Sequence, residues 1–208
     1  MDNPYRQTRF LDSVADPSRL PSDTGREIAF AGRSNAGKSS ALNTLVGRRR
    51  LARTSKTPGR TRLLNFFEVA PQHYLVDLPG YGYAKVPEAV RLQWQRTLEH
   101  YLRTRQALVG MVLLLDIRRE PGELDHALLD WSNWRELPIR VLLTKADKLK
   151  RGPAAAALQR TRAQLAPAYP LVDIQLFSAH TGAGQETLRA WLDGWLFPET
   201  QEPVDPAG

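Results

Sequence analysis

The chain has no cysteine among its 208 residues and only two methionines. Without cysteine there can be no disulfide scaffold, thiolate metal site or cysteine nucleophile. No apolar run reaches the length of a membrane-spanning helix, and the longest, around residues 111–115, is the length of a buried strand. Residues 1–25 carry four acids and lack the apolar stretch of a signal peptide. We therefore expect a cytoplasmic protein with no membrane attachment.

The composition is that of an ordinary folded domain. Hydrophobic residues make up 42% of the chain and charged residues 25%, which argues against disorder, collagen or a coiled coil. The length suits one domain that can bury a core without cross-links. We expect an N-terminal extension over residues 1–25 with little core of its own, one domain over residues 26–198, a flexible tail over residues 199–208, and a monomer.

One segment accounts for the net charge of +7. Residues 48–62 contain no acid and seven bases, namely Arg48, Arg49, Arg50, Arg53, Lys56, Arg60 and Arg62. Without these seven, the remaining basic residues equal the acidic residues in number. Such a concentration of one charge indicates a polyanionic partner, although a solvated loop remains an open alternative.

From residue 27 onward, short apolar segments alternate with helical patterns. Strands are predicted at residues 28–31, 63–69, 73–76, 108–115, 139–143 and 171–177, and helices at 39–46, 88–105, 123–134, 153–165 and 184–196. A tight turn between the second and third strands makes them an antiparallel pair. The pattern predicts an α/β fold with a mostly parallel sheet of about six strands, one antiparallel edge strand and helices on both faces. Ligands of such sheets bind beyond the carboxyl ends of the strands.

A phosphate-binding motif directly follows the first predicted strand. It consists of Gly32, Arg33, Ser34, Asn35, Ala36, Gly37, Lys38 and Ser39. The spacing is that of a P-loop, in which glycines let backbone amides converge on phosphate oxygens at a helix N-terminus. We expect Lys38 to stabilise the β- and γ-phosphates and the Ser39 hydroxyl to bind magnesium.

A second motif ends the predicted strand pair, with the residues Asp77, Leu78, Pro79 and Gly80. A carboxylate at this position can hold magnesium through water, and the Gly80 amide can approach a γ-phosphate and sense its loss. Tyr81 follows, where Ras-like enzymes carry the glutamine that orients the attacking water. We expect Tyr81 to lie on a mobile loop with no catalytic role. Hydrolysis of the bound nucleotide should therefore be slow.

Two later strand ends predict which base is bound. The first carries Thr144, Lys145, Ala146 and Asp147, and the second carries Phe177, Ser178 and Ala179. A carboxylate at Asp147 can accept from N1–H and the 2-amino group of guanine, whereas adenine would leave it unpaired. The aliphatic stem of Lys145 can lie on the purine face, and an amide of the second loop can donate to guanine O6. This pattern favours a guanine nucleotide over the ATP of a P-loop kinase or ATPase.

Taken in order, these motifs resemble those of the bacterial YihA/YsxC/EngB-type GTP-binding proteins: GRSNAGKSS, TPGRT, DLPGYG, TKAD and FSA. The resemblance extends over residues 27–198. It implies a Ras-like P-loop GTPase fold, GTP and GDP as ligands, and a role in large ribosomal subunit assembly with a link to cell division and septation. The implied partner is the subunit precursor, with its rRNA and proteins, reached through the basic segment 48–62.

The resemblance also implies roles for single residues. The TPGRT loop adds Gly59, Arg60, Thr61, Arg62 and Leu63 to the GTP site. Thr61 is implied to join Ser39 on magnesium in the GTP state, and Asn35 to help hold a potassium ion against the phosphates. Thr144 stands where most GTPases place asparagine, as is common in this family. The sequence leaves open a second hypothesis, an RNA-binding assembly factor that binds GTP structurally with negligible turnover.

Overall fold

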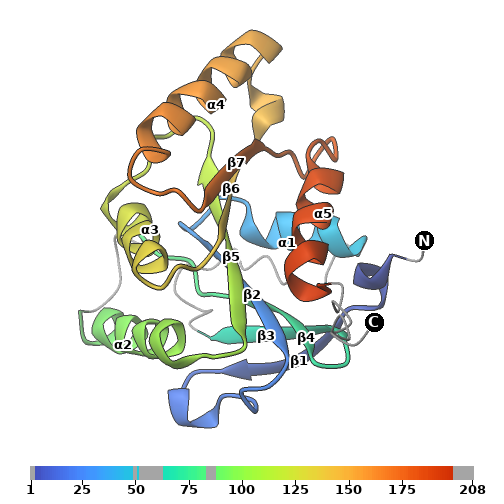
Figure 1. Ribbon diagram of the computed structural model, residues 1–208, viewed down its shortest axis with the longest axis vertical. Helices are drawn as coiled ribbons and strands as arrows, with labels where there is room; N and C mark the ends of the chain where they lie inside the picture. The colour runs from blue at the N-terminus through green and yellow to red at the C-terminus, as the bar shows by residue number, and fades with distance from the viewer. Residues whose placement is uncertain (1–2, 49–50, 52–62, 83–87, 199–208) are drawn as a thin grey trace, which may run out of the picture.

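A mixed parallel and antiparallel β-sheet forms the centre of the computed structural model, which describes residues 3–48, 51, 63–82 and 88–198. Among these residues the strand order is β1-β3-β4-β2-β5-β6-β7 (Figure 1). The strands are β1 (Arg9–Val14), β2 (Arg26–Gly32), β3 (Leu64–Ala70), β4 (His73–Asp77), β5 (Leu108–Asp116), β6 (Ile139–Thr144) and β7 (Val172–Leu176). Neighbours from β4 to β7 pair in parallel, whereas β3 runs antiparallel to β1 and β4.

Helices cover both faces of this sheet, as Figure 1 shows. The helices are α1 (Lys38–Val46), α2 (Glu88–Thr104), α3 (Glu123–Trp134), α4 (Arg151–Leu165) and α5 (Gln185–Leu196), with short 3-10 helices η1 (Pro4–Gln7), η2 (Pro17–Arg19) and η3 (Ala146–Lys148). Every strand and helix predicted from residue 27 onward is present, with limits within two residues of those predicted. The α/β fold with a mostly parallel sheet is thereby confirmed. In the described part of the chain, each helix is too short or too polar to cross a bilayer.

The continuous apolar sequence of β5 follows from its central position. Met111, Leu113 and Leu115 point into the hydrophobic core under α3 and α4. Val112 and Leu114 point into the second core, under α1 and α5. Because successive side chains of a strand face opposite sides, a strand buried on both faces needs apolar residues at every position.

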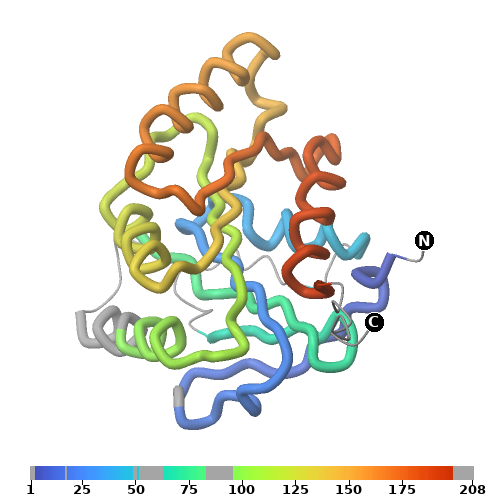
Figure 2. Tube along the Cα trace, viewed as in Figure 1, coloured from blue at the N-terminus to red at the C-terminus, as the bar shows by residue number. Residues whose placement is uncertain are grey.

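The N-terminal segment contributes more to the fold than the sequence predicts. Strand β1 pairs with β3 and becomes the edge of the sheet, so that the antiparallel strand β3 lies one place inside it (Figure 2). Tyr5 is buried, and its hydroxyl donates to Asp193 of α5 at 2.7 Å. Most β1 side chains are exposed, so no apolar run marks the strand in the sequence. Backbone pairing holds it, together with contacts to β3 such as Ser13 to Asn65. The boundary proposed at residue 25 stays a prediction.

A buried ion pair anchors the end of the sheet opposite the predicted ligand site. Glu27, at the start of β2, is fully buried and accepts from the Arg105 guanidinium and from the Tyr101 hydroxyl. Arg105 also donates to the carbonyl oxygens of Pro21 and Ser22. A carboxylate removed from water is tolerated only when it is paired and hydrogen-bonded. The pair therefore ties α2, β2 and the segment before β2 together.

Candidate functional site

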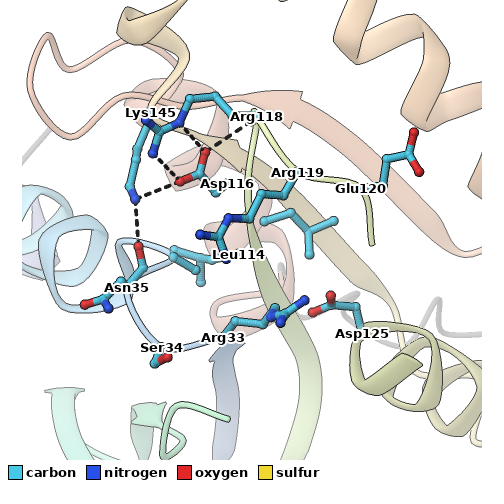
Figure 3. Close-up of a pocket in the computed structure, with 12 residues that line it drawn as sticks. Arg33, Ser34, Asn35, Leu114, Asp116, Arg118, Arg119, Glu120, Asp125 and Lys145 are labelled. Carbon is cyan, nitrogen blue, oxygen red and sulfur yellow. Dashed lines mark hydrogen bonds and ion pairs between the residues drawn. The ribbon is translucent and has the colours of Figure 1, made fainter. Parts of the chain in front are cut away.

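The predicted site residues gather at the carboxyl ends of the parallel strands. Asp77 ends β4 and Thr144 ends β6, while the phosphate loop follows β2. Asp116, which belongs to none of the predicted motifs, ends β5 beside them. A cavity of about 330 Å³ opens here, between the phosphate loop, the end of β5 and Lys145 (Figure 3). Residues far apart in the sequence thus meet at one edge, as expected for an α/β sheet.

The phosphate loop has the backbone that the motif requires. Gly37 takes a left-handed φ of +96° directly before α1, a conformation that glycine adopts without strain. At Gly32, a side chain would bring its Cβ within 2.9 Å of the Leu114 carbonyl oxygen, so the loop packs against β5 only with glycine there. Helix α1 begins at Lys38, and the amides of its first turn have no partner within the helix. Such amides are suited to bind an anion.

Lys38 and Asp77 form an ion pair beside this loop. Both side chains are largely buried, with exposed fractions of 11% and 12%. An ammonium group has three donors, so Lys38 can keep this pair while it also donates to a phosphate oxygen. The two motifs predicted to surround the phosphates are therefore in direct contact.

The oxygen donors here fit magnesium better than a transition metal. Ser39 supplies a hydroxyl next to Lys38, and Asp77 supplies one carboxylate. In the described ranges there is no cluster of three or more His, Cys, Asp or Glu side chains. Magnesium is commonly held by one or two carboxylates together with water and substrate phosphates. A site of this composition needs a phosphorylated ligand to complete it.

Tyr81 lies in a buried position, and the expectation of a mobile loop is wrong for this residue. Its side chain is 4% exposed, and its hydroxyl donates to Asp125 of α3 at 2.5 Å. Its carbonyl oxygen accepts from the Ser34 amide of the phosphate loop at 2.8 Å. Burial, together with the neighbouring Asp125 carboxylate, raises the pKa of Tyr81 well above its usual range. Its hydroxyl is therefore protonated and engaged in packing against α3.

Two side chains of the predicted base-binding loop bond directly to the phosphate loop. The Thr144 hydroxyl lies 2.6 Å from the Ala36 carbonyl oxygen and 3.0 Å from the Leu115 carbonyl oxygen, and shares its proton between them. The Lys145 ammonium donates to the Asn35 carbonyl oxygen at 2.7 Å. The phosphate and base loops therefore form one connected unit.

Asp147 is held by the second predicted base loop. The Ser178 hydroxyl donates to its carboxylate at 2.6 Å, and the Ala146 amide donates to the Phe177 carbonyl oxygen. The bond from Ser178 lowers the pKa of Asp147 below its usual value, so the carboxylate is ionised at neutral pH. The sequence predicts a backbone amide from residues 177–179 at the base, but gives no sign of the bond from the Ser178 hydroxyl to Asp147.

Other predicted residues contribute little to the described geometry. Gly59, Arg60, Thr61 and Arg62 lie outside the described residues, as does most of the basic segment. Leu63 directly precedes β3 and is half-buried. The Arg48 guanidinium donates to the Thr8 carbonyl oxygen at 3.0 Å, so this base takes part in the fold.

This fold and site define the chain as a P-loop GTPase. Residues 27–145 match the family model described as "50S ribosome-binding GTPase". "Probable GTP-binding protein EngB" of Nitrosococcus oceani is 55% identical, covering 94% of this chain and 98% of that protein. The protein of the same name from Azoarcus sp. is 54% identical, with 98% of each covered. The chain belongs to the EngB family of GTP-binding proteins.

Solved structures support the fold independently. The crystal structure of "a probable GTP-binding protein engB" superposes with a TM-score of 0.64 at 25% identity, covering 79% of this chain and 96% of that one. Era of Aquifex aeolicus, bound to GDP and AlF4⁻, has a TM-score of 0.65 at 21% identity and shares the fold. That likeness covers 88% of this chain and 60% of the Era chain.

Replacing Tyr81 by phenylalanine tests its link to α3. Asp125 is 1% exposed, so the loss of one donor leaves a buried carboxylate less well satisfied. We expect Tyr81→Phe to lower the free energy of unfolding by about 1–3 kcal/mol in urea titrations. The matched control is Tyr169→Phe, because Tyr169 also donates to a carboxylate of α3, but to the exposed Asp130, which water can solvate. Equal costs in the two variants would contradict a special role for the Tyr81 contact.

Proposed function

We propose that the protein is a magnesium-dependent GTPase switch that acts in the cytoplasm on the precursor of the large ribosomal subunit. The proposal includes a need for the protein in normal cell division and septation. The observation that carries the proposal is the direct bonding between the phosphate loop and the base loop at one edge of the sheet. The family match to ribosome-binding GTPases supports the partner.

In this proposal the chain holds each part of the nucleotide with residues suited to it. The Lys38 ammonium and the phosphate-loop amides other than those of Ser34 and Ala36, which donate to carbonyl oxygens of the chain, bind the phosphates. Asp147 reads the guanine edge. Ser39 and Thr61 are the proposed magnesium ligands, with Asp77 acting through water. Magnesium supplies charge neutralisation at the β- and γ-oxygens. Gly59, Arg60, Arg62 and Leu63 line the γ-phosphate side in the same proposal.

Slow intrinsic hydrolysis follows from the residues near the γ-phosphate. The Tyr81 hydroxyl is committed to Asp125, so it is unavailable to orient a water molecule. We propose instead that Asn35, whose side chain is exposed at the phosphate loop, helps to hold a potassium ion. Such an ion would place positive charge where other GTPases use an arginine finger.

The Asp147→Asn variant tests the base assignment. An amide accepts from N1–H and donates to the 2-carbonyl of xanthine, so preference should move from GTP to XTP. We expect GTP affinity to fall at least about ten-fold and XTP affinity to rise, measured by competition with a fluorescent nucleotide. Ser178→Ala is the control, because it removes the orienting bond but keeps the carboxylate, and so should still prefer GTP. Unchanged base preference in Asp147→Asn would remove this residue from the guanine site.

Single-turnover hydrolysis distinguishes a switch from a structural GTP-binding factor. If the protein is a switch, GTP hydrolysis should be faster when large-subunit particles are added. If Asn35 helps to hold potassium, hydrolysis should also be faster in potassium than in sodium, and Asn35→Ala should lose this response. Equal rates with and without particles would favour the alternative, an RNA-binding assembly factor with negligible turnover. Equal rates in the two salts would end the potassium proposal alone.

Pelleting with large-subunit particles across a salt series tests the basic segment 48–62. Five to seven phosphate contacts predict a slope of roughly −3.5 to −6 for log affinity against log salt. Neutralising Arg49, Arg50 and Arg53 to glutamine should flatten it by about 2–3. Arg48 is left intact because it bonds to Thr8.

A matched control replaces three exposed bases outside the segment by glutamine, namely Arg19, Arg103 and Arg151. This control has the same net charge as the variant of Arg49, Arg50 and Arg53, but its salt dependence of binding should match that of the wild type. We expect tighter binding to the particles with a non-hydrolysable GTP analogue than with GDP. Thr61, the proposed magnesium ligand of the GTP state, would then order the segment, and an ordered array of bases loses less entropy on binding than a flexible one. Identical slopes for both variants would show that the segment is only a solvated loop.

A further inference from the structure

Asp116 is a buried carboxylate beside the base loop that no sequence motif includes. It is the last residue of β5 and lies opposite Thr144 in the parallel register with β6. Its side chain is 9% exposed, after a strand that is otherwise entirely apolar or glycine. Figure 3 shows the carboxylate directed toward Lys145 rather than away from the site.

Two cations hold this carboxylate. Arg118 donates from Nε at 2.9 Å and from its terminal nitrogen at 2.7 Å, with an exposed fraction of 51% for the arginine side chain. The Lys145 ammonium donates to Oδ2 at 2.8 Å. The bonds from Arg118, with that from Lys145, hold the pKa of Asp116 far below its usual value. Asp116 is therefore charged throughout the physiological range.

The position of Lys145 needs such a partner. Its backbone takes a left-handed φ of +59°, and its side chain reaches back to the phosphate loop at Asn35. The ammonium then bridges two points, the Asp116 carboxylate and the Asn35 carbonyl oxygen. A lysine side chain has four rotatable bonds and loses much entropy when it is fixed. One neutral carbonyl oxygen would hold it less firmly than a carbonyl and a carboxylate together.

We propose that Asp116 is a positioning residue for guanine-nucleotide binding, which holds the Lys145 ammonium so that the lysine stem lies ready against the purine. The inference rests on the proposed guanine site at Thr144–Asp147 and names a residue outside that motif on which it depends. Asp116 touches no part of the nucleotide in this proposal. It acts by making the lysine rigid before the ligand arrives.

The Asp116→Asn variant keeps the shape of the side chain but loses its charge. We expect the affinity for GDP to fall roughly ten-fold, because a charge-assisted bond becomes a neutral one. The loss should come mainly from faster dissociation, measured by stopped-flow with fluorescently labelled GDP. Asp173→Asn makes the same chemical change in an ion pair of β7 with Arg140, and should leave GDP affinity unchanged. Arg118→Gln removes the outer partner only and should change affinity less than two-fold, since Lys145 keeps its carboxylate.

A double-mutant cycle separates positioning from a merely structural effect. If Asp116 acts through Lys145, Asp116→Asn should cause no further loss of affinity in a Lys145→Ala background. A purely structural role would lower the melting temperature and reduce affinity by the same factor in both backgrounds, which would overturn the proposal. If Asp116→Asn fails to fold, Asp116→Glu takes its place, because it keeps the charge near Arg118 but displaces the carboxylate by one methylene.

The outcomes also separate this inference from the proposed guanine site. Wild-type GDP affinity in Asp116→Asn, with a base preference that still switches in Asp147→Asn, would reject Asp116 and leave the guanine site intact. Wild-type affinity in Asp116→Asn, Lys145→Ala and Asp147→Asn alike would reject the guanine site itself, and with it the role of Asp116.

Discussion

One buried hydroxyl joins the three chain segments on which the binding edge depends. Thr144 is 3% exposed, and its proton is shared between carbonyl oxygens of the phosphate loop, at Ala36, and of β5, at Leu115. Valine has a similar shape but no donor, so it would leave both oxygens without this partner. Most GTPases place an asparagine here, with more donors and a longer reach. The shorter threonine meets the same requirement because β5, β6 and the phosphate loop pack closely, with glycine at position 32 facing Leu114.

The opposite end of the sheet is fixed by a different kind of interaction. Glu27 and Arg105 form a buried pair at the amino end of β2, and Tyr101 completes the carboxylate's bonds. Between the two ends the central strands are apolar on both faces, and their shared cores resist deformation. The apolar middle of β2 and β5 therefore separates the ligand end of these strands from the anchor at the other end.

The parts of the site that follow from the sequence are those in which chemistry demands fixed residue types at fixed spacing. A phosphate loop needs its glycines and lysine within eight residues, and a guanine reader needs a carboxylate just after a strand. Asp116 has no such signature, since a carboxylate after an apolar run is ordinary. The Tyr81–Asp125 bond joins residues 44 apart, and no local pattern predicts that pairing. The sequence does not predict strand β1, because most of its side chains are exposed and form no apolar run. It is held by backbone pairing with β3 and by side-chain contacts such as Phe10 with Phe67.

The contacts around Gly80 limit how a γ-phosphate could be sensed. Asp77, on one side of it, is paired with Lys38, and Tyr81, on the other, is bonded to the phosphate loop and to α3. Both flanking residues are buried, so moving the loop as a whole would break a buried ion pair and a buried hydrogen bond together. A rotation of the peptide group between Pro79 and Gly80 leaves those contacts intact, whereas the Leu78 and Tyr81 amides donate to carbonyl oxygens of Phe30 and Gly32. Glycine suits that position because its backbone can rotate with little steric cost. The same two anchors would let a change at Gly80 reach α3 through Tyr81, since Asp125 also caps that helix by accepting from the Gly122 amide.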